Sequence, residues 1–124
     1  MTIQEVSEKI TPILKANHVE FAGVFGSVAR GEDKENSDID LLIRPGTNSP
    51  KGLAYIGLQL QLEGALGRKV DLINEKFLHP FIRPNVEKEL ITLYGQSSNL
   101  QKAYLGSHRQ DTKIYQRSQL RRVS

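Results

Sequence analysis

Two carboxylates and a short glycine–serine pair suggest chemistry near the start of the chain. Gly26-Ser27 is followed by ten residues and then by Asp38-Ile39-Asp40. Residues two apart on a strand point to the same face, so Asp38 and Asp40 present their carboxylates together. Two such charges repel each other unless a cation lies between them. Mg²⁺ fits, because it prefers oxygen ligands, accepts one or two carboxylates and keeps places for water and phosphate.

The glycine–serine pair offers a place for phosphate, because it ends an apolar, β-branched stretch and opens a short helical turn. Free backbone N–H groups at the start of a helical turn favour an anion. Gly26 lets the phosphate approach the backbone, the Ser27 hydroxyl can donate to a phosphate oxygen, and Arg30 adds positive charge. Two alternatives stay open: Ser27 as a helix cap alone, and Arg30 in a surface ion pair with Glu32 or Asp33.

A third acid, Asp71, stands in a second short apolar stretch, VDLI. If its strand lies beside the strand of Asp38 and Asp40, three carboxylates converge. This arrangement suits two metal ions that clamp an in-line phosphoryl or nucleotidyl transfer, with Asp71 as a metal ligand or as the base for the incoming hydroxyl. The alternatives are a strand-terminating role for Asp71 and a solvated strand edge for the acid pair.

Hydrophobic periodicity predicts the elements that must position these residues. The first helix starts at Ile3, capped by Thr2 and Glu5, and is kinked or restarted at Pro12. The other expected elements are strands over 19–25, 38–44 and 69–74, a helical turn over 27–31, and helices over 51–66 and 80–94. In the helix over 51–66 we expect an apolar face that contacts the core, made of Leu53, Ile56, Leu60 and, less regularly, Leu62 and Leu66. A partner surface on part of this face is the alternative. This order predicts an α/β fold with a small mixed β-sheet flanked by helices.

Charge divides the 124-residue chain into a domain over 1–95 and a basic tail over 96–124. The first part carries 11 Lys/Arg and 13 Asp/Glu, a net charge of −2, and the tail carries six Lys/Arg and one Asp, a net charge of +5. The tail is rich in Gln, Ser, Arg and Lys, which predicts flexibility or one weak helix over 109–122. Nucleic-acid binding by the domain is therefore disfavoured, and weak contact through the tail is the alternative.

Composition excludes several kinds of site. The chain has no cysteine, which rules out disulfides, thiolate metal sites and a cysteine nucleophile and is compatible with a reducing cytoplasm. No apolar stretch approaches the roughly 18 residues that a membrane span needs. We therefore expect a cytoplasmic protein with no membrane partner.

The stretches FGSVARGE, SDIDLLI and VDLI together resemble the nucleotidyltransferase fold of the polymerase beta superfamily. The residues that match its pattern of Gly-Ser, ten residues, Asp-x-Asp and a third acid are Gly26, Ser27, Asp38, Asp40 and Asp71. Within the superfamily, residues 3–95 are similar to minimal nucleotidyltransferases, the MntA-like antitoxins of HEPN/MNT toxin–antitoxin modules. The basic tail has no counterpart in this pattern.

The resemblance implies an enzyme that uses Mg²⁺, two ions in all, to transfer AMP from ATP to a tyrosine of a cognate HEPN-domain toxin and so neutralises it. The glycine–serine pair and Arg30 would bind the nucleotide, and the three acids would be catalytic and hold the metal. The chain has no room for the acceptor-binding helical domains of antibiotic nucleotidyltransferases and poly(A) polymerases, so a toxin partner would complete the site. The rivals are a small-molecule, aminoglycoside-type nucleotidyltransferase and a non-catalytic antitoxin that acts by steric binding.

Overall fold

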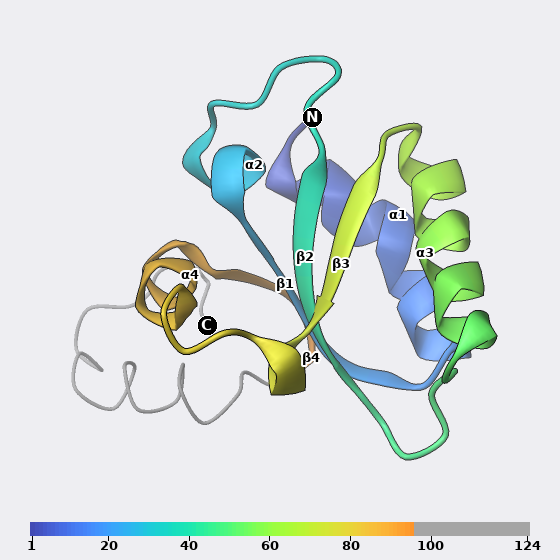
Figure 1. The fold of residues 1–124 in the computed structure, drawn as a ribbon. Helices are drawn as coiled ribbons and strands as arrows, with labels where there is room; N and C mark the ends of the chain where they lie inside the picture. The colour runs from blue at the N-terminus through green and yellow to red at the C-terminus, as the bar shows by residue number, and fades with distance from the viewer. Residues whose placement is uncertain (96–124) are drawn as a thin grey trace.

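The computed structural model describes residues 1–95, which form a four-stranded mixed sheet with helices on both faces (Figure 1). The strands, in the spatial order β3-β2-β1-β4, are β1 (Val19–Phe25), β2 (Ile39–Pro45), β3 (Val70–Asn74) and β4 (Ile91–Gly95). The helices are α1 (Ile3–Ala16), α2 (Gly26–Arg30), α3 (Leu53–Leu66) and α4 (Arg83–Glu89), with a 3-10 turn η1 (Glu75–Phe77). The predicted fold class is confirmed. The predicted tail, with its possible helix over 109–122, lies outside the described residues.

The first helix begins as predicted. Thr2 Oγ1 accepts a hydrogen bond from the Glu5 N–H at 3.0 Å, and Glu5 Oε1 accepts one from the Thr2 N–H at 2.7 Å. This reciprocal pair is a capping box and satisfies two backbone donors at the helix start. α1 then continues through Pro12 to Ala16, so the predicted restart at Pro12 is wrong. No helix within residues 1–95 is long and apolar enough to cross a membrane.

The larger core lies between the sheet and the layer formed by α1 and α3, which lie on the same side of it (Figure 1). Ile39, Leu41 and Ile43 of β2 point into this core and are fully buried. The residues between them point to the opposite face, where Leu42 packs against a second, smaller cluster under α4. Asp40 therefore comes to the face that carries α2 and α4.

α3 faces the core through only part of the apolar face that we predicted. Leu53, Ile56 and Leu60 are 85%, 50% and 61% exposed, so their assignment to the core is wrong. Leu62 and Leu66 are buried as predicted, and the third buried residue is Leu58, which the prediction missed. Apolar side chains occur all round this helix, so its periodicity does not define a single buried face.

Polar side chains of α3 bind the backbone of β3, which is an outer strand of the sheet. The Tyr55 hydroxyl donates to the Leu72 carbonyl at 3.2 Å, and Gln59 Nε2 donates to the Val70 carbonyl at 2.8 Å. The Glu63 carboxylate accepts from the Val70 N–H at 3.0 Å. These three helix residues are four apart and share one face. α3 therefore fixes the position of the strand that carries the third acid.

The single helix predicted over 80–94 is wrong. α4 covers only residues 83–89, the backbone becomes extended at Leu90, and β4 then pairs antiparallel with β1. The β-branched residues Ile91 and Thr92 favour a strand, and partners on β1 are available to it. The Ser7 hydroxyl of α1 also donates to the Leu93 carbonyl at 3.0 Å and ties β4 to the first helix.

Candidate active site

The sheet places two of the three predicted acids side by side. β2 and β3 are parallel, and Asp40 is the register partner of Asp71. Asp38 precedes β2 directly and is exposed. The negative charges of Asp71 and Asp38 both act on the Asp40 carboxyl. The three carboxylates therefore lie at one end of β2 and β3, on the face that α2 and α4 partly cover.

The surroundings of the Asp40 carboxyl disfavour its charged form. Burial raises its pKa above the ordinary value, and the neighbouring charges of Asp71 and Asp38 raise it further. Arg30 lowers the pKa of Asp40, but it does not cancel the other effects. Because neighbouring carboxylates contribute to this shift, a cation beside them would favour the ionised form of Asp40.

Gly26 lies directly against Asp40. Phe25, the last residue of β1, is the register partner of Asp40, and Gly26 then opens α2 with φ +75°. A Cβ atom on Gly26 would come closer than 3.0 Å to Asp40 Oδ2 and within 3.1 Å of its Cγ. Glycine is therefore favoured here by both its backbone conformation and the space available. The Asp40 carboxylate consequently contacts the predicted phosphate-binding turn.

A carboxylate that the sequence analysis missed bridges two of the predicted nucleotide-binding groups. Glu89, the last residue of α4, accepts from the Gly26 N–H at 3.0 Å through Oε1 and from Arg30 Nη1 at 2.8 Å through Oε2. Arg30 also donates from Nε to Glu32 Oε1 at 2.9 Å. The ion pair considered as an alternative for Arg30 is therefore present, with Glu89 as an additional partner. No motif could have revealed Glu89, because it is 63 residues from Gly26.

The donor set suits a magnesium ion that shares its coordination with substrate. Within residues 1–95, no three carboxylate or imidazole groups are gathered closely enough to form a complete metal site by themselves. Mg²⁺ does not need such a cage, since it commonly takes one or two carboxylates and completes its shell with water and phosphate oxygens. The paired Asp40 and Asp71, with Asp38 nearby, supply oxygens of this kind.

Comparison with known proteins identifies several relatives. The family described as polymerase beta, nucleotidyltransferase, matches residues 8–99. A predicted protein adenylyltransferase of Methanocaldococcus jannaschii is 38% identical over 91 residues, which are 73% of this chain and 97% of the relative. The protein adenylyltransferase MntA of Thermococcus cleftensis is 36% identical over 95 residues, which cover 73% of this chain and 95% of the relative.

Solved structures share the fold. A predicted minimal nucleotidyltransferase is 36% identical, with a TM-score of 0.62, over 73% of this chain and 95% of the other. A chain in the complex of tri-AMPylated Shewanella oneidensis HEPN toxin with MNT antitoxin has a TM-score of 0.62 at 21% identity. That match covers 98% of this chain and 92% of the other. At such low identity the second likeness is evidence for the fold alone.

Proposed function

Because the chain belongs to the polymerase beta nucleotidyltransferase family, we propose that it is an antitoxin enzyme that transfers AMP from ATP to a tyrosine of a cognate HEPN-type toxin. Its curated relatives at 36–38% identity carry the name protein adenylyltransferase, which supports this reaction class. The observation that carries the proposal is the pairing of Asp40 with Asp71 on adjoining parallel strands, with Gly26 against Asp40.

The chain's own groups divide into a phosphate side and a metal side. The Gly26 backbone and the Ser27 hydroxyl hold the triphosphate, and Arg30 adds positive charge once phosphate competes for its carboxylate partners. Asp38, Asp40 and Asp71 would hold two Mg²⁺ ions. Bound Mg²⁺ supplies positive charge that neutralises the phosphates and polarises the α-phosphate.

In the transfer step, the acceptor hydroxyl oxygen forms a bond to the α-phosphorus. The bond from that phosphorus to the bridging oxygen breaks, and pyrophosphate leaves with the electron pair. Asp71 accepts the hydroxyl proton or orients the hydroxyl for its loss to water. Asp38 and Asp40 would hold the metal that offsets the phosphate charge, so most of the catalysis would come from position and electrostatics.

Intact-mass spectrometry of the cognate toxin tests the proposal. Toxin is incubated with this protein, Mg²⁺ and ATP, and we expect it to gain whole AMP units. Asp38→Asn and Asp40→Asn should lower this transfer by orders of magnitude while the protein remains folded. Glu35→Gln is the matched control, because Glu35 is an exposed acid of the preceding loop and should transfer normally when neutralised.

The other outcomes separate the rivals. A stable complex with no AMP on the toxin would show steric inhibition instead of transfer. Neither complex nor adduct would point to a small-molecule acceptor. Normal transfer by Asp38→Asn would contradict the assignment of the acids to catalysis.

A further inference from the structure

The three acids are not held in the same way. Asp40 and Asp71 lie inside paired strands, so the ladder between β2 and β3 fixes their backbones. Asp38 lies outside β2, at the end of the loop that follows α2. The ladder begins at the next residue, where the Ile39 N–H donates to the Lys69 carbonyl at 2.9 Å. The direction of the Asp38 side chain therefore depends on what anchors the loop before it.

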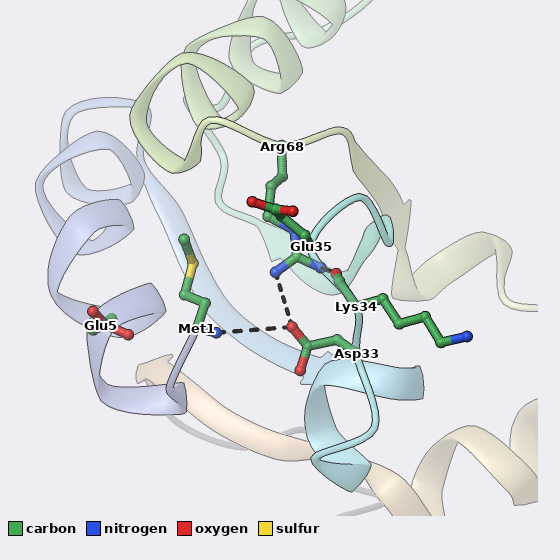
Figure 2. Close-up of a pocket in the computed structure, with 6 residues that line it drawn as sticks. All are labelled: Met1, Glu5, Asp33, Lys34, Glu35 and Arg68. Atoms are coloured by element: carbon green, nitrogen blue, oxygen red, sulfur yellow. Dashed lines mark hydrogen bonds and ion pairs between the residues drawn. The ribbon is translucent and has the colours of Figure 1, made fainter.

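Arg68 anchors that loop. Its Nε and Nη2 both donate to the Ser37 carbonyl, at 3.0 and 2.7 Å, and Nη2 also donates to the Lys34 carbonyl at 3.1 Å. Its Nη1 donates to Asp33 Oδ2 at 2.9 Å, the interaction drawn in Figure 2. The Arg68 side chain is only 9% exposed, and its bonds to Ser37 and Asp33 are partly buried, whereas the bond to Lys34 is exposed. The guanidinium thus donates two hydrogen bonds to the carbonyl of the peptide bond between Ser37 and Asp38.

The anchor is itself well fixed. Arg68 follows Gly67, which ends α3 in the left-handed conformation, and it precedes β3 by two residues. Asp33 Oδ2 also lies 3.8 Å from the amino group of Met1, so the N-terminus that precedes α1 contacts the loop as well (Figure 2). Arg68 therefore links the segment that leads to Asp71 with the segment that leads to Asp38.

We propose that Arg68 is a positioning residue that sets the orientation of Asp38 for metal and nucleotide, acting through the Ser37 carbonyl. This inference rests on the proposed function, since it assigns Asp38 to the metal side of the site. A planar guanidinium presents several donors in a fixed fork, and a lysine ammonium at the same place cannot reproduce the paired contacts. The contact to Asp33 stabilises the loop, but the carbonyl contacts define the direction of the next residue.

The test compares Arg68→Lys with Arg44→Lys. The second variant makes the same chemical change in β2, away from the loop that leads to Asp38. Arg44 is another partly buried arginine, paired with Glu20 and Glu75 at 3.3 Å each and placed over the Phe21 ring. Mn²⁺ binding is followed by the electron paramagnetic resonance of the free ion, with protein alone and with a non-hydrolysable ATP analogue. Circular dichroism melts show that each variant is folded, and AMP transfer is measured in parallel.

We expect Arg68→Lys to weaken Mn²⁺ binding and lower turnover by about tenfold each, the scale seen when groups behind a metal ligand are changed. Arg44→Lys should lose thermal stability but bind Mn²⁺ as the wild type does. Wild-type metal binding in Arg68→Lys, or an equal loss in Arg44→Lys, would overturn the proposal. If the wild type binds Mn²⁺ more tightly than Asp38→Asn does but modifies no toxin, the proposed acceptor is wrong while the role of Arg68 stands. If it binds no Mn²⁺ through Asp38, both fail.

Discussion

Substituting Gly26 by alanine should separate backbone strain from damage to the site. The new Cβ would lie closer than 3.0 Å to Asp40 Oδ2 and 3.1 Å from its Cγ, whereas ordinary contacts begin at 3.4 Å. Because Asp40 stands on a paired strand, its backbone cannot retreat, and the carboxylate has to swing away. Gly26 also has φ +75°, which an L-residue adopts at a cost.

The two effects have different magnitudes and different readouts. The left-handed backbone costs a non-glycine residue about 1–2 kcal/mol of folding free energy. In a domain of this size each kcal/mol lowers the melting temperature by about 4–8 °C. The displaced carboxylate affects chemistry instead, since a shift of about 1 Å in a catalytic group can cost on the order of 100-fold in rate. We therefore expect Gly26→Ala to lose both stability and turnover.

Gly31→Ala is the control that carries the strain without the clash. Gly31 has φ +72°, nearly that of Gly26, and a Cβ there would meet nothing within 4 Å. The two variants should therefore show similar thermal melts, while Gly31→Ala retains near-normal AMP transfer. Equal turnover in the two variants would refute the contact between Gly26 and Asp40 as a determinant of activity.

Two further predictions concern charge at the site. The first concerns Asp40, whose raised pKa means that its carboxyl keeps its proton to higher pH in the folded protein than in the unfolded chain. Ionisation of Asp40 therefore lowers the free energy of unfolding as pH rises above about 4. Metal-free Asp40→Asn should accordingly melt above the wild type at pH 7, and the difference should vanish in melts near pH 4 and below. The second prediction concerns Glu89→Gln, which keeps an acceptor for the Gly26 N–H but removes the negative charge opposite Arg30. Fluorescence titration with a nucleotide analogue should therefore show up to about fivefold tighter binding. Weaker binding would show that the Glu89 charge supports the turn.

A period of two on a strand predicts that Asp38 and Asp40 lie on one side of it. The sequence leaves open whether the strand of Asp71 lies beside that of Asp40, and the parallel pairing of β2 with β3 decides it. Glu89 and Arg68 could not be found in this way. Each reaches its partners across 31 or more residues of sequence, and an arginine or glutamate in a polar segment carries no local sign of such a contact.

The errors in the fold have a similar cause. Over 80–94 the apolar spacing is compatible with a helix. Residues 91–95 form a strand instead because they pair with β1. In α3 the apolar residues surround the helix, so the choice between Leu58 and Leu60 depends on where α1 and the sheet lie. Tertiary pairing and packing decided both cases, and neither is visible in a single segment.

The side chains that bind the outer strands also limit how this protein can associate with others. An outer strand with unpaired N–H and C=O groups can accept a strand from another chain, which leads to domain swapping or aggregation. Backbone groups of this kind on β3 are hydrogen-bonded to the side chains of Tyr55, Gln59 and Glu63, and one on β4 is hydrogen-bonded to Ser7. Extension of the sheet by a partner would first have to displace these contacts. A protein partner that docks on side-chain surfaces would leave these contacts, and the strand that carries Asp71, undisturbed.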